Sequence, residues 1–190
     1  WTLDGDKLLA LKVPPTLTGV LQARLDGLPR QERHALQLAS VIGLNFWDQA
    51  LGHIELRATE QLPALQGREL VNPKDVNEAL GGDLGNDVRE FAFRQQILHQ
   101  VTYGTVLKAT RRKAHAKAAE WLSQHSGTRA NGLLLGAAAR HFELAGDSAN
   151  AAEHYARAAA RAAATFSHDT ALDYTARALK LAAPDDIALH

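Results

Sequence analysis

Apolar residues recur every three or four positions along most of the chain, which is the spacing of a buried helical face. Near the N-terminus, Pro14 and Pro15 block helix propagation, and Thr16 is expected to cap the helix that follows. The positions of this helix expected to face inward are Leu17, Val20, Leu21, Leu25 and Leu28. Gly27 and Pro29 predict its end.

Three more helices are expected before the pattern changes. They cover residues 31–42 with Gly43 as a stop, a short segment capped by Asn45, and residues 58–69, where Pro63 limits the first turn. Their expected inward positions are Leu36, Ala39, Ile42, Trp47, Leu51, Ile54, Leu62 and Leu65.

The period then changes to two. The segments "ELV" (residues 69–71) and "REFAF" (residues 89–93) predict two short strands, and the glycine-rich residues 81–87 predict the turn between them. A winged-helix domain has this order of elements, several helices followed by one β-hairpin. The chain is therefore expected to be mainly α, with a winged-helix subdomain that contains a small β-hairpin.

Helical spacing resumes at Gln95 and continues almost to the end. One helix has its buried face at Ala114, Ala118, Trp121 and Leu122. Three alanine-rich helices follow, over residues 133–145, 148–164 and 168–182, with Gly146 as a stop and Asp147 and Ser167 as caps. A short pattern occurs twice in these helices, first as Ala151, Tyr155 and Ala158 and again as Ala171, Tyr174 and Ala178.

Small residues that face a tyrosine let helices approach closely, as in tetratricopeptide-type hairpins. The two occurrences are about 20 residues apart, whereas a regular repeat has 34. We therefore expect a short, degenerate array of antiparallel helical hairpins.

Composition narrows the function. The 190 residues contain 46% hydrophobic residues, enough for a folded core, and 21 basic residues balance 21 acidic ones. A dedicated nucleic-acid binder usually has a basic excess. The absence of cysteine excludes disulfides and thiolate metal sites. No apolar run reaches the length of a membrane span and no signal peptide opens the chain, so we expect a cytoplasmic protein without a membrane contact.

Four segments in order carry a family resemblance: "VPPTLTGVLQARLDGLPRQERHALQLASVIGLNFWDQAL", "LPALQGRELV", "FAFRQQILHQVTYGTVLKATRRKAHAKAAEWL" and "AARHFELAGDSANAAEHYARAA". Over essentially its whole length, the chain resembles the region after the ATPase module in bacterial signal-transduction ATPases with numerous domains, the STAND-type P-loop ATPases. The subgroup it resembles most consists of large proteins with an adenylate/guanylate cyclase domain, a P-loop ATPase and tetratricopeptide repeats.

The resemblance implies a division into an entry segment (residues 1–13), a winged-helix subdomain (14–93), a helical arm (94–130) and the start of a tetratricopeptide-like array (131–190). It also implies a non-catalytic regulatory region. ATP and Mg²⁺ belong to the upstream ATPase, because this sequence has no G-x-x-x-x-G-K-[ST] motif. Where the family often has histidine in F-R-H, this chain has Gln95, so that role is absent or has moved to His99.

The expected partners are the upstream ATPase module, a protein or peptide bound by the helical array, and a second copy of the chain. The basic residues Arg111, Arg112, Lys113 and Lys117 are candidates for a docking surface, although their spread around one helix also fits a solvated connector. Tyr155 and Tyr174 are candidates for a partner surface, and the alternative is that they fill space between helices.

A DNA-binding winged helix in a transcriptional regulator is the alternative function. It is disfavoured because the third expected helix, "FWDQALGHI", has no lysine or arginine for phosphate contacts.

Catalysis and metal binding are not expected. Ser167, His168 and Asp169 are sequence neighbours and cannot converge as a triad, and the nine histidines lie on separate expected elements.

Overall fold

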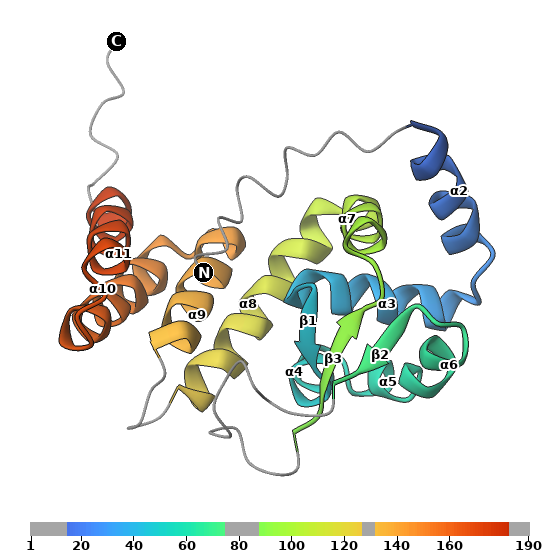
Figure 1. Ribbon diagram of the computed structural model, residues 1–190, viewed down its shortest axis with the longest axis horizontal. Helices are drawn as coiled ribbons and strands as arrows, with labels where there is room; N and C mark the ends of the chain where they lie inside the picture. The colour runs from blue at the N-terminus through green and yellow to red at the C-terminus, as the bar shows by residue number, and fades with distance from the viewer. Residues whose placement is uncertain (1–14, 75–87, 127–131, 183–190) are drawn as a thin grey trace. The chain divides into compact units, whose positions relative to one another are not determined.

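The computed structural model describes residues 15–74, 88–126 and 132–182. These residues form a mainly helical protein with one small antiparallel sheet (Figure 1). The chain divides into two compact units, residues 1–75 with 90–107 and residues 76–89 with 108–190. The main division thus falls after Leu107, inside the range expected for the helical arm. The expected entry segment and glycine-rich turn lie outside the described residues.

The first unit combines short helices with the sheet. Its elements are α2 (Pro15–Asp26), α3 (Arg30–Ile42), β1 (Asn45–Trp47), α4 (Asp48–Ile54), α5 (Leu56–Thr59), α6 (Leu62–Gly67), β2 (Val71–Pro73), β3 (Glu90–Phe93) and α7 (Gln96–Thr105). The strand order is β1-β3-β2, and both pairs are antiparallel. Phe46 lies opposite Phe91, and their rings stack with centroids 5.7 Å apart. Both side chains are buried, so the sheet contributes an aromatic centre to the core of this unit.

Strand β1 was not expected from the sequence. Asn45, expected to cap a helix, is the first residue of this strand and pairs with Ala92, while the helix starts at Asp48. The β-ladder gives the backbone of residues 45–47 hydrogen-bond partners. Pairing also lets Phe46 enter the core, which outweighs the local preference of asparagine for a cap.

Three further details of the first unit differ from the expectation. Helix α2 begins at Pro15, so Thr16 lies inside it; proline suits the first helical position because the N–H it lacks has no helical partner there. Val20, an expected inward position, is 66% exposed, while Leu21 and Leu25 of the same helix are buried. The expected helix over residues 58–69 is broken into α5 and α6, since Pro63 cannot donate to a preceding turn.

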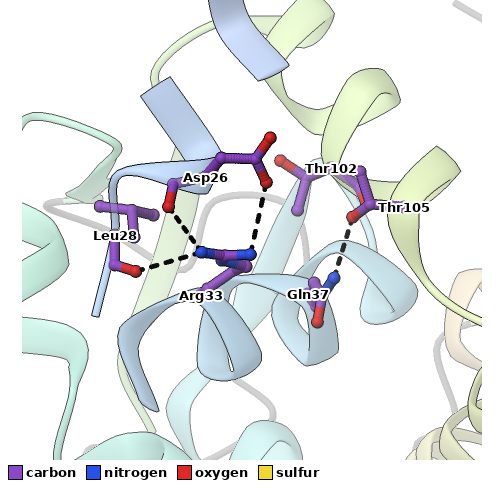
Figure 2. Close-up of polar contacts among 6 residues, drawn as sticks. All are labelled: Asp26, Leu28, Arg33, Gln37, Thr102 and Thr105. Carbon is purple, nitrogen blue, oxygen red and sulfur yellow. Dashed lines mark hydrogen bonds and ion pairs between the residues drawn. The ribbon is translucent and has the colours of Figure 1, made fainter. Parts of the chain in front are cut away.

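Polar contacts of α3 join it to its neighbours on both sides (Figure 2). Arg33 donates from Nη2 to the backbone oxygen of Asp26 at 2.6 Å, and its Nη1 lies 3.3 Å from Asp26 Oδ1. One turn later, Gln37 Nε2 donates to Thr105 Oγ1 of α7 at 3.0 Å. These bonds fix the α2–α3 turn and hold α7 against α3.

The second unit is a succession of helices, α8 (Lys108–His125), α9 (Gly132–Ala145), α10 (Ser148–Ala164) and α11 (His168–Ala182). Each helix packs on the next one in sequence. The predicted face of α8 is confirmed, because Ala114, Ala118, Trp121 and Leu122 are all buried. Alanine dominates these contacts, so the helices can approach closely.

The predicted boundary between α9 and α10 is also confirmed. Gly146 has φ +81°, the left-handed conformation that ends a helix at low cost only for glycine. The Asp147 side chain accepts a hydrogen bond from the Asn150 backbone N–H at 3.1 Å, which caps α10.

Candidate interaction surface of the helical unit

The basic residues of α8 do not form one free surface. Arg112, Lys113 and Lys117 are exposed and Arg111 is partly buried. Arg112 Nε donates to the backbone oxygen of Ala145 at 3.1 Å, which satisfies a carbonyl at the C-terminal end of α9. A Cβ at Gly146 would lie 2.7 Å from Arg112 Nη2, so glycine also makes room for this contact. Arg112 therefore has a structural role.

A buried histidine pair lies between α8 and α9. The Nδ1 atoms of His115 and His141 are 2.9 Å apart, and both side chains are almost fully buried. Burial, and after it the charges of His141, Arg111 and Arg140, lower the pKa of His115 to about 3. His115 is not among the buried positions that the sequence predicts for this helix. Nothing in the sequence linked it to a residue 26 positions later.

Tyr155 is enclosed between helices, with 1% of its surface exposed. Its hydroxyl donates to Glu143 Oε2 at 2.8 Å, and the Arg177 guanidinium lies 5.9 Å from the ring centroid. Burial and the Glu143 carboxylate raise the pKa of Tyr155 to about 12. This side chain fills inter-helix space, and a partner has no access to it.

Tyr174 is half-buried beside Tyr155, with the two ring centroids 5.7 Å apart. Its ring lies against Gly136 of α9, where an added Cβ would overlap the Tyr174 hydroxyl. Burial also raises the pKa of Tyr174. The structure therefore brings the two candidate tyrosines together.

The opposite side of α11 is open. Leu172 and Leu179 are 69% and 67% exposed and lie two helical turns apart. Together with Thr175 and Ala176 they form what we call the outward face of α11. The packed face carries Ala171, Tyr174 and Ala178, so apolar residues occupy two sides of one helix. A helix of this kind is typical of a position between two neighbours. The seven-residue spacing of Leu172 and Leu179 could have predicted this face from the sequence. It was missed because the repeat around Tyr155 and Tyr174 had already assigned the buried face of this helix to other residues.

A serine–histidine contact joins α8 to α10. His154 Nδ1 lies 2.8 Å from the Asn150 carbonyl oxygen and donates to it. In the neutral imidazole, Nε2 then accepts from the Ser123 hydroxyl at 2.8 Å. Each polar group is thereby satisfied, as a buried contact between helices requires.

In the described parts of the chain, no group of three or more histidine or acidic side chains is placed to hold a metal ion.

His99, the position to which the family histidine could have moved, is in α7 of the first unit. One ring nitrogen lies 2.9 Å from the Ser40 carbonyl oxygen, and the ring meets the edge of Phe93 with centroids 5.2 Å apart. Burial lowers the pKa of His99, and the bond to Ser40 offsets part of that effect. Gln95 is exposed at the start of α7.

Comparison with known proteins yields no match to a family model, a curated protein or a solved structure. Among the helices within the described ranges, none combines the length and apolar character needed to cross a membrane.

Proposed function

We propose that this chain is a non-catalytic regulatory and interaction region of a multidomain STAND-type signal-transduction ATPase, linked to a cyclase or another output regulator. In this proposal the first unit is a winged-helix module and the second is the start of a tetratricopeptide-like array. ATP and Mg²⁺ bind to the upstream ATPase of the same protein.

The element order of the first unit supports the winged-helix assignment. Helices α3 to α6 precede the β2–β3 pair, and the pair is antiparallel, as the wing of such a module requires. The additional strand β1 pairs with the other side of β3. The sheet contacts α3, α4, α6 and α7. In the proposal, this unit docks on a neighbouring module and is released again.

The outward face of α11 is the surface at which we propose that a partner binds. Helices α9 and α10 each pack between two neighbours, whereas α11 packs on α10, touches α9 through Tyr174, and has no fully buried residue. Burying both leucines would remove apolar surface worth roughly 1.5–3 kcal/mol each. The occupant we infer is a helix of the parent assembly with an apolar stripe, since the packing inside this unit is helix on helix throughout.

Regulation follows from two-state coupling. If the first unit docks on the ATPase in one nucleotide state, and a helix on α11 binds better in one of the two arrangements, each event shifts the other's equilibrium. The free energy available is limited to the difference in affinity between the two states. The chain itself performs no chemical step in this scheme.

The test begins with the coding sequence upstream of residue 1. A P-loop motif within about 250–300 residues, the length of one to two domains, is expected. In the parent protein, amide hydrogen exchange of residues 168–182 is then compared with that of the 190-residue chain. We expect slower exchange in the parent, and faster exchange again after Leu172→Asp with Leu179→Asp.

Equal exchange of α11 in the parent and in the shorter chain would contradict the docking proposal. A start codon close to residue 1 would remove the link to an ATPase. Val20→Asp is the matched control, because it places a charge at another exposed apolar position, in the first unit. It should leave the exchange of residues 168–182 unchanged.

A further inference from the structure

A pocket of about 780 Å³ opens between α3 and the segment from Glu55 to Gln61 in the first unit. This volume lies within the range of small-molecule sites. All of its lining belongs to the first unit, so the pocket does not depend on the helical array. We call it the α3–α5 pocket.

Most side chains that line the α3–α5 pocket end in a polar group, and their aliphatic parts also contribute to its wall. Apart from Ala58, every side chain that lines it is charged, an imidazole or an amide. An apolar ligand would leave these donors and acceptors unpaired, at a cost of about 1–3 kcal/mol for each group. The pocket therefore suits a ligand that is itself hydrophilic.

Some of the charged groups in the lining are already engaged. Arg33 is held by Asp26 and by the Leu28 carbonyl, as Figure 2 shows. His34 Nε2 lies 2.9 Å from Glu55 Oε2. These contacts fix the wall of the pocket and occupy the polar ends of Arg33, His34 and Glu55.

Two arginines in the lining are not engaged in this way. Arg30 at the start of α3 and Arg57 in α5 are exposed, and neither forms a hydrogen bond or ion pair with another described residue. A guanidinium presents five N–H donors in a planar fork that matches a carboxylate or phosphate group. Glu60 supplies the opposing charge in the same lining.

We propose that the α3–α5 pocket binds a small hydrophilic oxyanion, a molecule bearing carboxylate or phosphate groups, through Arg30 and Arg57. Gln31 and Gln61 line the same space and supply amide groups for the neutral polar atoms of the ligand. Glu60 weakens binding and so limits the site to ligands with more than one negative charge. Nothing in this site depends on the proposed ATPase link.

The test is calorimetric titration of the 190-residue chain with pyrophosphate and, separately, with citrate. We expect saturable binding with a Kd of about 0.1–1 mM for at least one of them. Arg30→Gln and Arg57→Gln should each weaken binding by about 2–10-fold, the net value of one solvent-exposed hydrogen bond. Glu60→Gln should strengthen it by about 2–3-fold through loss of a repulsive charge. A preference for one titrant identifies phosphate or carboxylate as the recognised group.

Arg161→Gln is the matched control, because it removes the same charge from an exposed position of α10 in the second unit. If Arg161→Gln weakens binding as much as Arg30→Gln, the attraction is non-specific and the proposal is wrong. Absence of binding by both anions, or no strengthening in Glu60→Gln, would also overturn it. All four substituted side chains are exposed, and circular dichroism verifies that each variant keeps its helical content.

Discussion

At the scale of single residues, the His115–His141 pair links the stability of the second unit to pH. Two Nδ1 atoms at 2.9 Å form a hydrogen bond only if one donates and the other accepts, so at least one ring must be neutral. Protonation of His115 to its charged form is disfavoured, because Arg111 on α8 and Arg140 on α9 add positive charge beside the pair.

Acid is therefore expected to destabilise the second unit through His115. The folded-state pKa of His115 is about 3, below its unfolded value of 6.5, so the unfolded chain binds the proton more readily. Its contribution to stability is fully present above pH 6.5 and is lost as pH falls toward 3, at no more than about 1.4 kcal/mol per pH unit. Urea unfolding at several pH values should show a flatter dependence for His115→Gln.

The comparison needs a control because carboxylates also titrate at the acidic end of this range. His168→Gln replaces an exposed histidine at the start of α11 and should retain the pH dependence of the unchanged chain. Parallel curves for His115→Gln and the unchanged chain between pH 6.5 and 4.5 would show that the buried pair does not carry the effect.

Gly136 is a second residue where a small change, the addition of one Cβ atom, is expected to alter the stability of the second unit. Gly136→Ala would place a Cβ against the Tyr174 hydroxyl and 2.6 Å from its Cζ, so α11 or the ring must move. We expect a loss of about 1–3 kcal/mol in the free energy of unfolding, the usual range for overpacking. Gly104→Ala in α7 has open space and should gain about 0.5–1 kcal/mol from helix propensity.

Opposite signs for these two glycine variants in thermal unfolding would confirm that Tyr174, and not helix propensity, decides the cost. Combining Gly136→Ala with Tyr174→Ala should cost less than the sum of the two single changes, because the second removes the group that the first displaces. Strict additivity would contradict the contact.

At the scale of elements, the start of α10 depends on one side chain. Asp147 Oδ1 accepts from the Asn150 backbone N–H and Asp147 Oδ2 from the Asn150 side-chain amide at 2.7 Å. Asp147→Ala should lower the free energy of unfolding by about 1 kcal/mol, whereas Asp147→Asn keeps an acceptor and should cost only a few tenths. Denaturant unfolding distinguishes the two. An equal cost for both would mean that charge, not the cap, is what matters.

Elements with long helical periodicity were predictable from the sequence, and short ones were not. The buried face of α8, the stop at Gly146 and the cap at Asp147 follow from local spacing and from the conformational freedom of glycine. Strand β1 did not, because its three residues are held by pairing with β3, about 45 positions later in the chain. The outward face of α11 was also missed, since a sequence does not show which of two apolar helix faces is covered.

At the scale of the whole molecule, the division after Leu107 predicts separate responses to core substitutions. Leu36→Ala removes a fully buried side chain of α3 and should cost about 2–5 kcal/mol in the first unit. Hydrogen exchange should accelerate in α3 and α7 and remain unchanged in α9 and α10. Acceleration of equal size in all four helices would show that the units unfold as one.

The charge distribution of the molecule also predicts weak affinity for DNA. In the first unit, Arg68, Arg94 and Lys74 each pair with an acidic side chain, and the exposed residues of α6, the helix before the wing strands, are small and uncharged. Binding to duplex DNA derives mainly from neutralised phosphates and is strongest at low salt. We therefore expect no shift in the fluorescence anisotropy of a labelled duplex at about 50 mM salt.

Salt-sensitive binding that disappears when Arg111, Arg112 and Lys113 are changed to glutamine would favour a transcriptional regulator over the proposed interaction region. Because Arg112 also holds the end of α9, that triple variant could lose binding through altered folding. Lys113→Gln with Lys117→Gln is the cleaner test, since both side chains are exposed and neither caps a helix. Binding retained in this pair but lost in the triple variant would trace the effect to the α8–α9 joint and not to phosphate contacts.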